Sequence, residues 1–118
     1  MEALIARSEL TIDIGAVRRN AKTLLEALAG AELWAVVKAD GYGHGALTVA
    51  EGALGAGATG LCTATVAEAL ALRPEFATTR IVVMGPTSKR EIAQAREARL
   101  ELVVADDGPL PDDVLMVV

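Results

Sequence analysis

Short apolar runs alternate with amphipathic segments along the chain. The runs have the length of β-strands, whereas the segments between them repeat apolar residues every three or four positions, as helices do. The ranges predicted as strands are 9–14, 33–38, 61–64, 80–84, 100–105 and 114–118. The ranges predicted as helices are 17–28, about 46–57, 65–72 and 88–99. Strands and helices that alternate in this way predict βαβ units, with parallel strands and right-handed crossovers.

Two of the predicted helices begin with a capping box, in which a hydroxyl residue is followed three positions later by glutamate. Thr65 with Glu68, and Ser88 with Glu91, fit this pattern. Gly30 is placed to stop the first predicted helix.

The last apolar run follows an acidic segment that contains prolines. This connection is short for a helical crossover, which takes about a dozen residues. Either the chain is part of a larger fold, or the run 114–118 pairs at a sheet edge. Asp106, Asp107, Asp112 and Asp113 lack the spacing of a calcium-binding loop and are expected in a solvated turn.

Composition excludes several classes of protein. The 118 residues carry a net charge of −5, which argues against binding to nucleic acid or to anionic lipid. No apolar run approaches the roughly 20 residues of a membrane span, and the first residues do not resemble a signal peptide, so a cytoplasmic protein is expected. Cys62 and His44 are the only residues of their types, so neither an internal disulfide nor a zinc site is expected.

Candidate chemistry lies where the second predicted strand meets a glycine-rich loop. Strand alternation places Trp34, Val36 and Lys38 on one face, and the loop predicted at 39–45 follows. Ligands of parallel α/β sheets bind at the carboxyl ends of the strands. A lysine cation on an apolar face is costly, and a Schiff base with a carbonyl cofactor would consume its amine. The alternative is a solvent-exposed lysine beside glycines that serve only turn geometry.

The sequence Val-Val-Lys-Ala-Asp-Gly-Tyr-Gly-His-Gly at 36–45 resembles the lysine motif of bacterial alanine racemases, which use pyridoxal 5′-phosphate. The ranges 11–20, 68–73 and 81–85 are similar to other parts of the same family. The resemblance therefore covers nearly the whole chain.

This resemblance implies an α/β fold that forms the N-terminal part, about half, of a (β/α)₈ (TIM) barrel, with 1–118 as a single partial domain. In such a family Lys38 would form the Schiff base with the cofactor and act as one of two acid/base groups. Tyr42 would bind the cofactor phosphate, and Met84 would line the pocket, on a weaker match. The implied reaction interconverts L-alanine and D-alanine, a supply of D-alanine for peptidoglycan, in a homodimer with a further β-rich domain.

The family's second base is a tyrosine of the partner subunit, and Tyr42 is this chain's only tyrosine. The chain alone is therefore expected to be inactive. Serine or broad-specificity racemases share the motif, while related decarboxylases and cofactor-handling barrels lack its Tyr-Gly-His-Gly part. A different interpretation is a small phosphate- or carboxylate-binding module on an open flavodoxin-like sheet, with no enzymatic activity.

Three further side chains are interpreted as structural. His44 is expected to organise the loop, Cys62 to behave as a small buried hydrophobe, and Trp34 to fill a core rather than stack on a cofactor.

Overall fold

A computed structural model of the chain describes residues 5–104 and 115–117. The helices are α1 (Ile14–Leu28), α2 (Lys38–Tyr42), α3 (Ala46–Ala56), α4 (Val66–Leu72) and α5 (Lys89–Glu97). The strands are β1 (Trp34–Val36), β2 (Gly60–Thr63), β3 (Arg80–Val83), β4 (Glu101–Val103) and β5 (Leu115–Val117). Among the described residues, no helix is both long enough and apolar enough to cross a membrane.

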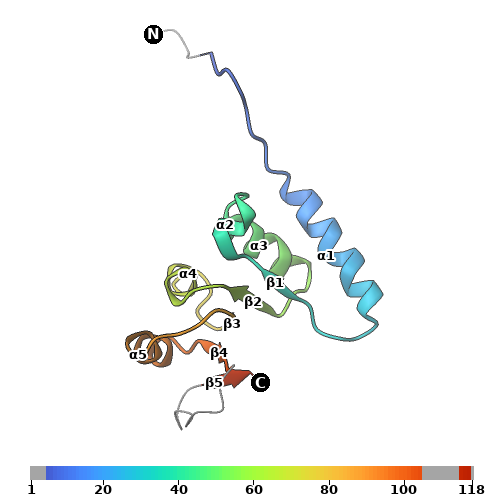
Figure 1. Cartoon of the computed structure of the whole chain (residues 1–118). Helices are drawn as coiled ribbons and strands as arrows, with labels where there is room; N and C mark the ends of the chain where they lie inside the picture. The colour runs from blue at the N-terminus through green and yellow to red at the C-terminus, as the bar shows by residue number, and fades with distance from the viewer. Residues whose placement is uncertain (1–4, 105–114, 118) are drawn as a thin grey trace.

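The strands form one parallel sheet in the order β1-β2-β3-β4-β5 (Figure 1). Each strand pairs with the next in the chain, so right-handed crossovers place the connecting helices on the same face. A flavodoxin-like sheet has the order 2-1-3-4-5, in which the winding reverses. The flavodoxin-like alternative is therefore wrong, and the sheet is wound as in a (β/α)₈ barrel.

The hydrophobic core lies between the sheet and helices α3, α4 and α5. Alanines on the helices allow close approach to the strands. The fully or almost fully buried core residues are Val37, Leu61, Ile81, Val83, Leu100 and Leu102 on or next to the strands, and Ala50, Val66, Ala69, Leu72 and Ala95 on the helices.

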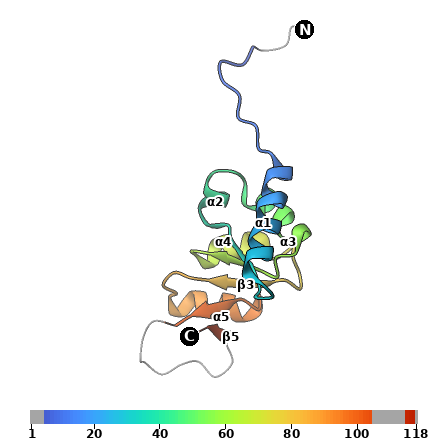
Figure 2. The same ribbon diagram turned by 90° about the vertical axis from the view of Figure 1, so that its right-hand side faces the viewer.

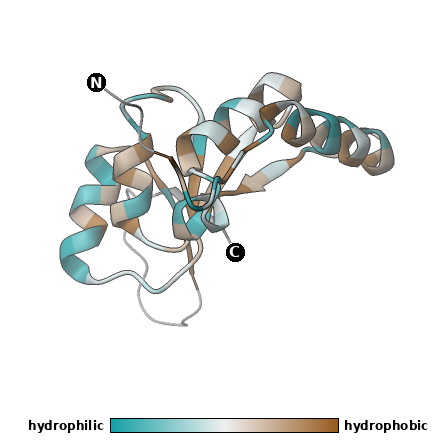
Figure 3. Ribbon diagram, turned by 90° about the horizontal axis from the view of Figure 1, so that it is seen from above, coloured by the Kyte–Doolittle hydropathy of each residue, from teal (hydrophilic) through white to brown (hydrophobic). Residues whose placement is uncertain are grey.

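Helix α1 packs on α3, and Gly52 of α3 makes the approach possible. A Cβ at Gly52 would lie only 2.8 Å from the Ile14 side chain and 3.1 Å from that of Val17. The helices carry hydrophilic and hydrophobic residues side by side, as amphipathic helices do (Figure 3).

The opposite face of the sheet carries a second row of side chains. Strand register brings Val36 beside Cys62, Cys62 beside Val82, and Val82 beside Glu101. Cys62 is buried, as expected, and burial, together with the charge of Glu101, raises the pKa of its thiol. This thiol is therefore a poor nucleophile.

Trp34 lies at the amino end of β1, on the same face. A Cβ at Gly60 would lie 3.0 Å from its ring, and the Arg80 guanidinium lies 4.4 Å from the ring centroid. Its indole N–H is buried and finds no hydrogen-bond partner among the described residues. Trp34 thus packs at the opposite end of β1 from Lys38, in keeping with a structural role.

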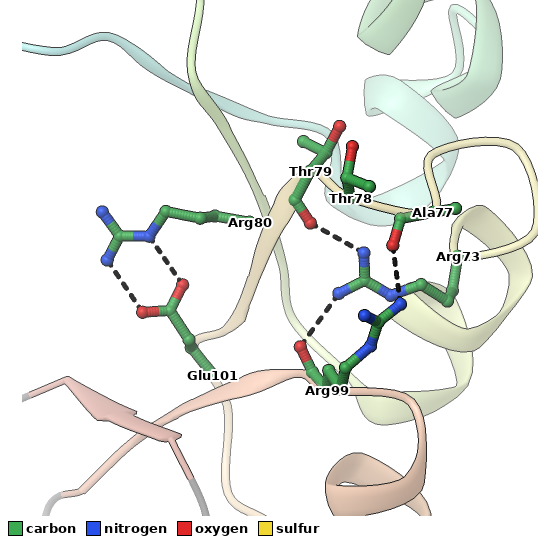
Figure 4. Close-up of a pocket in the computed structure, with 7 residues that line it drawn as sticks. All are labelled: Arg73, Ala77, Thr78, Thr79, Arg80, Arg99 and Glu101. Carbon is green, nitrogen blue, oxygen red and sulfur yellow. Dashed lines mark hydrogen bonds and ion pairs between the residues drawn. The ribbon is translucent and has the colours of Figure 1, made fainter.

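Arginines line a hollow of about 220 Å³ at this amino end (Figure 4). Arg73 donates hydrogen bonds to the carbonyls of Phe76, Thr79, Ala98 and Arg99. The other two arginines are also engaged: Arg99 donates to the Ala77 carbonyl, and Arg80 pairs with Glu101 through two bonds of 2.9 and 2.8 Å. The guanidiniums are thus committed to the protein itself, and the hollow is structural.

The strand predicted at 9–14 is wrong. Residues 9–13 extend away from the body of the molecule without regular structure (Figures 1 and 2), Leu10 is 79% exposed, and Ile14 already begins α1. Asp13 instead caps α1, because its carboxylate accepts a hydrogen bond of 3.1 Å from the Ala16 N–H. Alternation of polar and apolar residues does not make a strand unless another strand pairs with it.

The remaining predicted elements are confirmed, with shifted ends. Both capping boxes form. Strand β5 pairs in parallel with β4 at the sheet edge, which is the edge pairing considered above for the run 114–118. Helix α1 ends at Leu28, as predicted, but the left-handed residue that ends it is Ala29, one position before Gly30. The acidic residues between 105 and 114 lie outside the described residues.

Candidate active site

Lys38 lies at the carboxyl end of β1, two residues beyond the last strand residue. The sheet ladder continues through Val37, whose N–H donates to the Cys62 carbonyl at 2.9 Å. The Val37 side chain is 1% exposed in the helix-side core. Lys38 is the next residue, and the chain leaves the extended conformation at Val37 (ψ 19°), so that α2 begins with Lys38 at this edge of the sheet.

The predicted loop after Lys38 is a turn of left-handed helix, which differs from the prediction. Ala39, Asp40, Gly41 and Tyr42 have φ of 52°, 53°, 64° and 57°, and the Gly41 N–H donates to the Val37 carbonyl at 2.9 Å. This conformation costs a residue with a side chain about 1–2 kcal/mol, and it rarely occurs in succession. Strain of this kind persists only where the surroundings hold it, and it is concentrated at functional sites.

Several contacts fix the lysine turn, which we define as residues 38–42. The Asp40 carboxylate accepts a hydrogen bond of 2.9 Å from the Ala46 N–H at the start of α3. Gly41 is buried, and a Cβ there would lie 3.2 Å from the Ala46 nitrogen. His44 bonds the Gly41 carbonyl through Nδ1 at 3.1 Å, which agrees with its predicted role in organising the loop.

Glu68 connects the lysine turn to the neighbouring strand. Its Oε2 accepts a hydrogen bond of 2.6 Å from Ala39, and its Oε1 accepts bonds of 2.9 and 3.0 Å from Ala64 and Thr65. Burial alone would raise the pKa of Glu68, but the three backbone donors outweigh burial and lower it. The carboxylate is therefore held in its ionised form. The sequence pattern predicts only the capping-box role of Glu68, and the bond to Ala39 adds to it.

The structure brings Lys38 and Tyr42 together. The Lys38 Nζ lies 5.9 Å from the centroid of the Tyr42 ring, and Tyr42 is 59% exposed. Met84 follows β3 at the same edge of the sheet, where its N–H donates to the Thr63 carbonyl at 2.8 Å. An exposed phenol beside an amine is thus available to a ligand at this edge.

The nearby carboxylates do not neutralise the lysine. Asp40 and Glu68 accept bonds from backbone N–H groups, and within residues 5–104 and 115–117 no salt bridge involves Lys38. Lys38 is half-buried as a residue. Lys38 therefore differs from a structural lysine, whose amine is held in an ion pair. Its amine remains available for reaction.

Comparison with known proteins shows the family to which the chain belongs. The family model described as alanine racemase, N-terminal domain, matches residues 12–110. The chain belongs to the alanine racemase family. An alanine racemase of Pediococcus pentosaceus is 43% identical over 106 residues, which are 89% of this chain and 28% of that protein. The match thus spans less than a third of the length of this relative.

Solved structures of the family share the fold. An alanine racemase from Streptomyces coelicolor A3(2) has a TM-score of 0.75 and 48% identity, over 80% of this chain and 26% of its own. A histidine racemase from Leuconostoc mesenteroides has a TM-score of 0.72 and 34% identity, over 78% of this chain and 25% of its own. The shared region is therefore the N-terminal portion of a TIM barrel, and it is similar in racemases named for two different amino acids.

Proposed function

We propose that the chain supplies the cofactor-binding lysine of a pyridoxal-phosphate-dependent alanine racemase. The observation that carries the proposal is the free amine of Lys38 at the carboxyl end of β1, on a strained turn and beside Tyr42. Membership of the alanine racemase family supports the cofactor and the reaction. Relatives named for alanine favour that substrate over others.

The donor set fits this cofactor. An amine without a carboxylate partner condenses with an aldehyde, and a nearby phenol hydroxyl can bind a phosphate oxygen. We assign these roles to Lys38 and Tyr42. When bound, pyridoxal phosphate would supply a conjugated ring that spreads the negative charge left at the substrate α-carbon.

Lys38 then has two tasks. Its Nζ holds the cofactor before substrate arrives, and as a free amine it takes or returns the proton at the α-carbon from one face. Racemisation needs a second acid/base group on the opposite face. The family resemblance implies a tyrosine of the partner subunit for this group. Tyr42, the only tyrosine in the sequence, is assigned to the cofactor phosphate, so we place the second base outside this chain, in the rest of a dimeric enzyme.

The test compares the chain alone with a complete barrel. The complete-barrel chimera is the Streptomyces coelicolor racemase in which this chain replaces the matching segment. We expect the chimera to interconvert L- and D-alanine in the presence of pyridoxal phosphate, and the chain alone to show no turnover. A folded chimera without activity would contradict the proposal, and so would Lys38-dependent turnover by the chain alone. Chiral chromatography of the alanine product measures both.

A further inference from the structure

The two capping-box glutamates differ in what they bind. In the second box, the Glu91 carboxylate accepts the Ser88 N–H at 3.0 Å through Oε1, and within the described part of the chain its partners are confined to Ser88. In the first, Glu68 accepts the equivalent Thr65 N–H and also the N–H groups of Ala64 and Ala39. The bond to Ala39 does not belong to a capping box, because Ala39 lies 29 residues away in sequence.

The additional bond reaches the residue next to the candidate lysine. Ala39 is the first left-handed residue of the lysine turn, and its N–H belongs to the peptide group that joins it to Lys38. The other carboxylate oxygen is bound to the end of β2 and the start of α4. Glu68 therefore connects the ends of two adjacent strands across the edge at which Lys38 lies.

We propose that Glu68 is a positioning residue for Lys38. It holds the left-handed backbone at Ala39 and thereby fixes where the Lys38 amine stands. This inference rests on the proposed function of Lys38. Glu68 itself touches neither substrate nor cofactor in the proposal.

The substitution Glu68→Gln separates this role from helix capping. Both carboxylate oxygens accept hydrogen bonds, whereas a glutamine amide offers one accepting oxygen and an NH₂ group that only donates. The glutamine oxygen can therefore accept the N–H groups of Ala64 and Thr65, or the N–H of Ala39, but not all three. Glu91 binds Ser88 of its own capping box and has no bond like that from Glu68 to Ala39 among the described residues, and a capping box also forms with glutamine. Glu91→Gln is thus the matched control.

The experiment uses the complete-barrel chimera with pyridoxal phosphate. For Glu68→Gln we expect kcat to fall about 10- to 100-fold, with a smaller change in KM, as for a reacting group displaced by about an ångström. We also expect hydrogen exchange of the peptide containing the Ala39 amide to speed up at least about tenfold, from loss of the acceptor. Glu91→Gln should leave both measurements within about twofold of the unsubstituted chimera.

Thr65→Ala provides a second control on the same helix. It removes the hydroxyl that accepts the Glu68 N–H at 3.1 Å but keeps the carboxylate and its bond to Ala39. We expect this variant to melt at a lower temperature with an unchanged kcat per folded molecule. An equal loss of kcat in Thr65→Ala and Glu68→Gln would overturn the inference, as would unchanged kcat and exchange in Glu68→Gln.

The outcome also distinguishes the inference from the proposed function. Borohydride reduction of the unsubstituted chimera must fix the cofactor on Lys38, and if it does not, the proposed function fails whatever Glu68 does. If reduction fixes the cofactor on Lys38 of the unsubstituted chimera, and Glu68→Gln has the same kcat and the same exchange rate as Glu91→Gln, only the role of Glu68 is wrong.

Discussion

Replacing Lys38 by alanine in the complete-barrel chimera is expected to lower racemase turnover by at least about 10³-fold. Proton transfer by a positioned side chain contributes about 10²–10⁴-fold by itself, and this substitution also removes the covalent attachment of the cofactor. The measurement is the rate of D-alanine formation from L-alanine at saturating substrate and cofactor.

Lys22→Ala and Lys89→Ala are the matched controls, because these are the chain's other lysines and both are exposed. They should keep the turnover of the unsubstituted chimera within about twofold, since substitutions at exposed positions are nearly neutral. A folded Lys38→Ala variant that keeps a tenth or more of the turnover would contradict the assignment of Lys38.

Replacing Gly85 by alanine is expected to destabilise the barrel by about 3 kcal/mol, with a fall in melting temperature of roughly 10 °C. The Gly85 N–H donates to the Ala64 carbonyl at 3.0 Å, and a Cβ at Gly85 would overlap that carbonyl oxygen. The clash is with backbone, so the ends of β2 and β3 must separate. Calorimetry of the chimera measures the effect.

Gly55→Ala serves as the control for Gly85→Ala. Gly55 is an exposed residue inside α3, and the nearest atom to an added Cβ is the Arg18 Nε at 4.0 Å. Alanine is favoured over glycine inside a helix by about 1 kcal/mol, so this variant should be as stable as the unsubstituted chimera or more stable. Equal melting temperatures for the two variants would show that the close approach of Gly85 to Ala64 contributes little.

Much of the sheet could be predicted because its determinants are local. Apolar runs bounded by turn residues predict β1 to β4, and the two capping boxes predict where α4 and α5 begin. Strand order was not a local property, and the parallel pairing of consecutive strands was needed to decide between a barrel and a flavodoxin-like sheet. The strand prediction at 9–14 was wrong, because alternating polar and apolar residues form a strand only when another strand pairs with them.

The candidate site was predicted in part. The position of Lys38 after an apolar run, and Tyr42 four residues later, could be seen in the sequence. The left-handed turn could not, because Ala39, Asp40 and Tyr42 do not favour positive φ and adopt it only in this setting. The bond from Ala39 to Glu68 depends on β1 and β2 being neighbours in register, so only the folded chain brings these residues together.

The most direct test of the account is to find the residue that binds pyridoxal phosphate. The complete-barrel chimera is incubated with the cofactor and reduced with borohydride, and the modified lysine is identified by peptide mass spectrometry. We predict modification of Lys38 at least about ten times that of Lys22 or Lys89, because these two lysines are exposed residues of α1 and α5 and do not belong to the lysine turn. Equal modification of the three lysines, or none at Lys38, would contradict the account.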